Sequence, residues 1–86
     1  MLDEYRKEID EIDKKILSLL GKRVALFKKI GLLKRQQQLP IKDNEREAKK
    51  LIELTTQAQK LGINASFIND IWKRIFQESY KIEEEA

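Results

Sequence analysis

Apolar residues recur at helical spacing along most of the chain, in three segments that are separated by a polar stretch before Pro40 and by a short break at Gly62. The first segment runs from about Leu2 to Lys34 or slightly beyond, and its apolar positions follow the period of an α-helix. Gly21 and Gly31 fall inside it, where each is tolerated at a cost of about 1 kcal/mol. The pattern therefore predicts one very long N-terminal helix. The residues on its apolar face are Ile12, Ile16, Leu19, Leu20, Arg23, Phe27, Ile30 and Lys34.

A second helix is expected after Pro40, because proline and the residue before it do not continue a helix. Asp43 and Asn44 are both suitable N-caps, and Glu47 stands three residues after Asn44, as in a capping box. We expect this helix to end just before Gly62, because glycine favours the left-handed conformation that follows many helix C-termini. Its expected inward positions are Leu51, Leu54, Ala58 and Leu61.

The third helix is expected to begin at an N-cap, either Asn64 or Ser66. Two adjacent rows of residues on it are expected to face inward. The rows are Ile68, Ile71, Ile75 and Ile82, and Trp72, Phe76, Ser79 and Glu83. The acidic end of the chain, residues 83–86, is expected to fray. Together the segments predict an all-α fold of three helices in a single domain, residues 1–86.

The predicted first helix is too long for one copy of the chain to cover. At about 1.5 Å per residue it would be about 50 Å long, whereas a compact domain of this size has a radius of gyration of about 12 Å. The remaining residues cannot bury its whole apolar face. We therefore expect an intertwined homodimeric helical bundle, in which a second copy of the chain covers that face.

Composition narrows the possible chemistry. The 86 residues include no cysteine and no histidine, which excludes disulfides, histidine acid–base chemistry and ordinary zinc sites. Eighteen basic and 15 acidic residues are interleaved with a net charge of +3, as on a solvated helical surface, so no nucleic-acid partner is expected. The chain shows neither a signal-peptide pattern nor a membrane-spanning run. We expect a soluble cytoplasmic protein without a metal or another cofactor.

Arg23 lies in the middle of the apolar face of the first helix, and Lys34 lies only about 20° away around the same helix. A guanidinium at such a position needs a partner, because burying it unpaired costs several kcal/mol. The partner is either an acidic side chain, with Glu47 and Glu53 as candidates, or a negatively charged ligand. On spacing alone both remain open. Two inward-facing cations on one line favour a pocket for an anion.

Several segments together resemble the all-helical chorismate mutases, the class of small intertwined dimers. No single segment is specific, but the ordered set of Arg6, Arg23, Lys34, Asp43, Arg46 and Glu47 is. The similarity covers nearly the whole chain without a gap. The segments are residues 5–13, 19–23, 30–34, 40–47 and 75–79.

The resemblance implies a homodimer that rearranges chorismate to prephenate, on the route to phenylalanine and tyrosine. Arg6 would bind one substrate carboxylate in the site of the partner subunit, and Arg23 would bind the other carboxylate within its own subunit. Lys34 would donate to the ether oxygen of the breaking C–O bond, and Glu83 would face that oxygen from the opposite side. Arg23, Lys34 and Glu83 are thus the catalytic residues that the family implies.

Four further residues would bind the substrate. Glu47, together with the backbone near Asp43, would hold the substrate hydroxyl. Arg46 and Ser79 would complete the polar contacts. Such a pericyclic rearrangement requires no nucleophile, proton transfer or cofactor, but it does require restraint of a flexible dianion and positive charge at the departing oxygen.

Helical geometry separates Arg6 from the other cations. Arg6 precedes Arg23 by 17 residues, which places it about 100° around the helix and about 25 Å along it. A site that uses both arginines must therefore take one of them from another chain.

Two positions depart from the commoner family pattern. Where many relatives have glutamine, this chain has Glu83, and an ionised carboxylate there would repel the charge that develops on the ether oxygen. We therefore expect that Glu83 carries a proton in the active form. Lys50 is a lesser departure, since an apolar residue is expected one turn after Arg46.

Each candidate residue also has a purely structural interpretation. Asp43 and Glu47 suit helix capping, and Lys34 and Arg46 could be solvated charges at helix ends. Ser79 could be a small packing residue, and Glu83 could belong to the acidic tail. Trp72 and Phe76 are expected in the core.

Two other functions stay open. The first is an isochorismate pyruvate lyase, which removes pyruvate from isochorismate on a similar helical scaffold. The second is a non-catalytic regulatory or dimerisation module that binds an anion without converting it.

Overall fold

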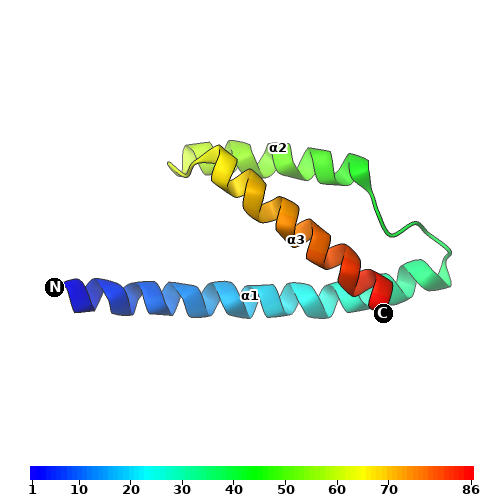
Figure 1. Cartoon of the computed structure of the whole chain (residues 1–86), viewed down its shortest axis with the longest axis horizontal. Coiled ribbons are helices and arrows are strands. Elements are labelled where there is room, and N and C mark those ends of the chain that lie inside the picture. Colours follow the sequence, from blue (N-terminus) through cyan, green and yellow to red (C-terminus); the bar gives the residue numbers. More distant parts are fainter.

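A computed structural model describes residues 1–86, and the chain forms three helices: α1 (Leu2–Gln36), α2 (Asn44–Lys60) and α3 (Ala65–Glu85) (Figure 1). The third helix runs diagonally between the other two and packs against both. There is no β-strand. The all-α fold with one very long N-terminal helix is therefore confirmed.

The first helix continues without a break through both of its glycines. It ends where Gln38 adopts a left-handed conformation with φ of 56°, which turns the chain out of the helix. The Leu39 N–H then donates to the Lys34 carbonyl at 2.8 Å, a bond typical of a Schellman motif. This ending lies before Pro40, as predicted.

The second helix uses Asp43, one of the two predicted N-caps. The Asp43 Oδ1 accepts a hydrogen bond from the Arg46 N–H at 3.0 Å. The capping box of Asn44 and Glu47 is wrong, because Asn44 is already helical and the Glu47 carboxylate bonds to α3 instead.

The end of the second helix is the glycine turn that the sequence predicts. Gly62 has φ of 72°, and the Ile63 N–H donates to the Ala58 carbonyl at 2.8 Å. Ala58 is buried, but Leu61 is 74% exposed. The inward placement of Leu61 is therefore wrong, because this residue caps the helix where the chain turns away and no element covers it.

The third helix starts at Asn64, whose Oδ1 accepts from the Phe67 N–H at 2.9 Å. It continues to Glu85, so the frayed acidic tail is a wrong prediction. The reason is a close crossing with α1 at Gly31. A Cβ on that glycine would lie 2.6 Å from the Glu83 carbonyl oxygen and 2.7 Å from its Cα, so only glycine allows the two backbones to approach this closely.

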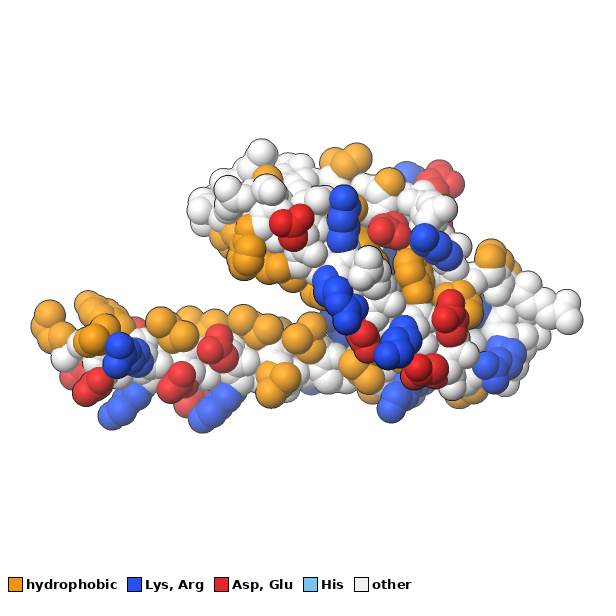
Figure 2. Space-filling model, in the orientation of Figure 1, with side chains coloured by type: hydrophobic (Ala, Val, Ile, Leu, Met, Phe, Trp, Pro, Cys, Tyr) orange, Lys and Arg blue, Asp and Glu red, His pale blue; other side chains and the backbone are white.

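The single chain has almost no core. Its buried residues are Gly31, Ala58, Ser79 and Glu83. All of residues 1–22 are exposed, and Figure 2 shows a row of hydrophobic side chains along the free half of α1. The radius of gyration is 15.9 Å, well above the value of about 12 Å for a compact domain of this length. The homodimer stays a prediction. None of the three helices combines the length and the apolar character needed to cross a bilayer.

Candidate active site

A cavity of about 300 Å³ lies where the C-terminal half of α1, the connection to α2, the start of α2 and the C-terminal half of α3 meet. Its wall combines apolar side chains with an unusual number of charges. All of the predicted site residues except Arg6 line it. The lining residues are Arg23, Phe27, Ile30, Lys34, Ile41, Asp43, Arg46, Glu47, Lys50, Trp72, Phe76, Ser79, Tyr80 and Glu83.

Lys34 and Glu83 form the most buried polar pair in this cavity. Lys34 Nζ lies 2.7 Å from Glu83 Oε1, and it also donates to the Ile41 carbonyl at 2.7 Å. The Glu83 side chain is only 1% exposed, and its Oε2 has no hydrogen-bond partner. The crossing at Gly31 places the two residues together, since it sets α3 directly against the turn of α1 that precedes Lys34.

Arg23 has no acidic partner. Its guanidinium carbon lies 5.2 Å from the centre of the Phe27 ring, a cation–π arrangement, and it forms no salt bridge. The two carboxylates considered as partners are engaged elsewhere: Glu47 with Tyr80, and Glu53 with Lys50 at 3.6 Å. An internal ion pair at Arg23 is therefore absent, and its charge is available to a ligand.

The first turn of α2 contributes three of the predicted residues. Asp43 serves as the cap, so its side chain is held by the Arg46 N–H. The Arg46 side chain forms no salt bridge. Glu47 is half-buried and accepts a hydrogen bond at Oε2 from the Tyr80 hydroxyl at 2.8 Å. Lys50, one turn later, lines the same cavity and is half-buried.

Ser79 lies at the wall of the cavity on α3 and is 5% exposed. Its Oγ donates to the Ile75 carbonyl of its own helix at 2.9 Å, as serine often does inside a helix. Its lone pairs remain able to accept a hydrogen bond from a ligand.

Tyr80 is the residue that the sequence analysis missed. It continues the row of Trp72 and Phe76 at a spacing of four residues, which was the available sign of its inward position. Burial, the hydrogen bond to Glu47 and the charge of that carboxylate together raise the pKa of Tyr80 to about 12. The hydroxyl therefore stays protonated and donates at neutral pH.

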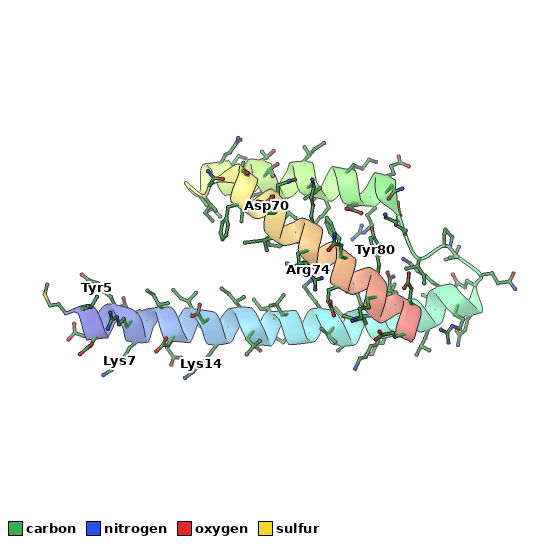
Figure 3. The ribbon with its side chains drawn as sticks, in the orientation of Figure 1. Tyr5, Lys7, Lys14, Asp70, Arg74 and Tyr80 are labelled. Atoms are coloured by element: carbon green, nitrogen blue, oxygen red, sulfur yellow. The ribbon has the colours of Figure 1, made fainter.

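Arg6 lies apart from these residues, on the half of α1 that nothing covers. It follows directly after Tyr5, which Figure 3 labels near the free end of the helix. The cavity of one chain therefore holds Arg23 and Arg46 but cannot include Arg6.

The sequence profile described as chorismate mutase type II matches residues 5–84. The chain belongs to the chorismate mutase type II family. This confirms the family that the ordered motif indicated. The matched range includes Arg6 and reaches past Glu83, so it spans every predicted site residue.

Several curated relatives of this chorismate mutase family member are longer proteins. The T-protein of Haemophilus influenzae is 39% identical over 79 residues, which are 92% of this chain and 21% of that protein. The bifunctional chorismate mutase/prephenate dehydratase of Aquifex aeolicus is 39% identical over 77 residues, 90% of this chain and 21% of that protein. A chorismate mutase of Methanocaldococcus jannaschii is 52% identical over 46 residues, 54% of this chain and 46% of that protein. The chain thus spans about a fifth of the length of the first two relatives.

Proposed function

We propose that this chain is an isomerase that converts chorismate to prephenate, a step of phenylalanine and tyrosine biosynthesis. The observation that carries the proposal is the cavity, which gathers Arg23, Arg46 and Lys34 around the buried Glu83 while neither arginine has a carboxylate partner. A dianionic substrate would supply the missing negative charge. Family membership supports the same reaction.

The reaction itself suits a site with this composition. The ether C–O bond breaks while a new C–C bond forms in the same molecule, so no atom is gained or lost. The site must hold the flexible substrate in its compact conformation and stabilise the charge that grows on the departing oxygen. Arginines can grip carboxylates with two parallel hydrogen bonds, and a lysine provides a point charge.

Lys34 and Glu83 would act on the ether oxygen. The ammonium of Lys34 donates to the oxygen as its charge develops, and donors of this kind are worth about 3 kcal/mol in other oxyanion sites. Glu83 donates from the other side when it carries a proton, whereas its ionised form repels the oxygen. Lys34 Nζ and Glu83 Oε1 lie 2.7 Å apart, so the two side chains must separate to admit the ether oxygen between them.

The remaining residues would hold the rest of the substrate. Arg23 binds one carboxylate, and Arg46 with Ser79 adds polar contacts. Glu47 and the backbone at Asp43 bind the ring hydroxyl.

The second carboxylate would be bound by Arg6 of a second copy of the chain. The exposed apolar half of α1 supports a homodimer, since it presents side chains such as Ile9, Ile12 and Ile16 that are each more than half exposed in one chain. Arg6 is carried on the same half of the helix, so covering this half with another subunit would bring Arg6 close to that subunit. The expected cytoplasmic location rests on the sequence alone.

The test is the loss of chorismate absorbance with purified wild-type protein beside Arg23→Ala. We expect turnover by the wild type and a fall in kcat/KM of about 10²- to 10³-fold in the variant, because it loses a charged contact to the substrate. Arg74→Ala is the matched control, since this arginine of α3 is exposed and bonds only to Glu78. It should retain nearly full activity.

A folded wild type that does not convert chorismate would overturn the proposal. Conversion of isochorismate with release of pyruvate would then favour the lyase. Binding of chorismate in a thermal-shift assay without turnover of either compound would favour the non-catalytic module.

A further inference from the structure

Two polar contacts between side chains join residues far apart in the chain: the ion pair of Lys34 with Glu83, and the hydrogen bond from Tyr80 to Glu47. The other side-chain pairs that form hydrogen bonds, such as Lys14 with Glu11 and Arg74 with Glu78, lie within one turn of an exposed helix. The contact from Tyr80 Oη to Glu47 Oε2, at 2.8 Å, joins residues 33 positions apart and is the only hydrogen bond between α2 and α3.

The position of this contact relates it to the site. Tyr80 follows the buried Ser79 and precedes Glu83 by three residues on α3, and all three line the cavity. Figure 3 shows Tyr80 on the part of α3 that lies nearest the start of α2. Glu47 comes from the first turn of α2, so the tyrosine hydroxyl reaches across the rim of the cavity to hold a carboxylate of the opposite helix.

One oxygen of the Glu47 carboxylate has no hydrogen-bond partner within the chain. Tyr80 occupies Glu47 Oε2, while Oε1 accepts no hydrogen bond within the chain and Glu47 forms no salt bridge. A glutamate side chain free to rotate would lose conformational entropy each time it bound a hydroxyl group. A hydrogen bond from a rigid tyrosine removes part of that loss before the substrate arrives.

We propose that Tyr80 is a positioning residue, which holds Glu47 Oε2 so that Oε1 is oriented to accept the ring hydroxyl of the substrate. This inference rests on the proposed function. It gives a role to Tyr80, to which the family resemblance assigned none. Tyr80 does not touch the reacting atoms in this proposal. It acts through Glu47.

The test compares wild type with Tyr80→Phe on two substrates, chorismate and an analogue that lacks the ring hydroxyl. The change deletes one oxygen and keeps the aromatic ring, which lines the cavity as Phe76 does. On chorismate we expect KM to rise about five- to tenfold with kcat within about twofold, because binding of the hydroxyl is lost equally from the ground and transition states. On the analogue the two proteins should have equal KM.

Two controls separate positioning from a structural effect. Tyr5→Phe removes the same hydroxyl from an exposed tyrosine without a hydrogen bond and should leave both substrates unaffected. Glu47→Gln combined with Tyr80→Phe should be no worse on chorismate than Glu47→Gln alone, since the tyrosine acts only through the glutamate.

An equal rise in KM on both substrates would overturn the inference, because Tyr80 would then support the cavity as a whole. So would an unchanged KM on chorismate. Either result with an active wild type leaves the proposed function standing. If the wild type binds chorismate but does not convert it, calorimetric Kd values replace KM in the same comparison. A wild type that neither binds nor converts chorismate would overturn both.

Discussion

The two halves of α1 share one helical period but lie in different surroundings. Residues 1–22 are exposed throughout, although the apolar side chains Ile12 and Ile16 recur there at core spacing. From Arg23 onward the same face packs against α3 and borders the cavity. The apolar period of a helix thus determines which face can be buried, whereas burial itself depends on what lies opposite that face.

The difference also divides the proposed site. The C-terminal half of α1 carries Arg23 and Lys34 into the cavity, while the N-terminal half carries Arg6 outside it. If a second copy covers the free half, the two halves of each helix serve different active sites. Three experiments test this difference between the two halves of α1.

The largest effect is expected from the Arg6→Ala and Arg23→Ala substitutions, tested alone and then combined on different subunits of one dimer. Arg6→Ala and Arg23→Ala should each lower activity about 10²-fold or more. When the two variants are unfolded and refolded together, each mixed dimer regains one intact site, made of Arg23 from one copy and Arg6 from the other. In random mixtures about a quarter of the wild-type activity should return.

The matched control for that experiment is a mixture of Arg23→Ala with Lys34→Ala. Both residues line the cavity of their own chain, so no mixed dimer contains an intact site and no activity should return. Absence of rescue in the first mixture, with dimers formed, would show that Arg6 acts within its own chain or not at all.

A smaller effect concerns the proton on Glu83, within the enclosed half of the comparison. A glutamine at this position keeps a donor for the ether oxygen and cannot carry a negative charge, so Glu83→Gln should convert chorismate with a kcat/KM equal to that of wild type or up to about tenfold higher. A large fall in kcat/KM of Glu83→Gln, measured beside wild type under the same conditions, would contradict a requirement for an uncharged donor here.

The smallest effects are expected on the free energy of unfolding, from substitution of the two glycines of α1. One glycine lies in each half of the helix. Gly31→Ala should lower the free energy of unfolding by about 1–3 kcal/mol, because its methyl group would overlap the Glu83 backbone. At Gly21 a Cβ has no neighbour within 4 Å, so Gly21→Ala should raise that free energy by up to about 1 kcal/mol through helix propensity. Urea unfolding at a fixed protein concentration measures both. Equal shifts would mean that the crossing at Gly31 tolerates a side chain.

Helix boundaries could be predicted because they depend on neighbouring residues, whereas most of the proposed site residues came from the resemblance to the family. Pro40, Asp43 and Gly62 limit the helices through local backbone geometry, and the period of α3 placed Ser79 and Glu83 on its inward face. The spacing of Arg23 and Lys34 similarly predicted that both face one pocket, because a helix fixes the angle between its own side chains.

Other features depend on contacts between residues far apart in the chain. The acidic tail stays helical to Glu85 and buries Glu83, because α1 offers Gly31 opposite Glu83. Glu47 bonds to Tyr80 instead of closing a capping box, because α3 places a hydroxyl 2.8 Å away. Periodicity determines the direction of a side chain along its own helix, but the partner it meets depends on how the helices cross. In this chain the close approach at Gly31 sets the crossing of α1 with α3.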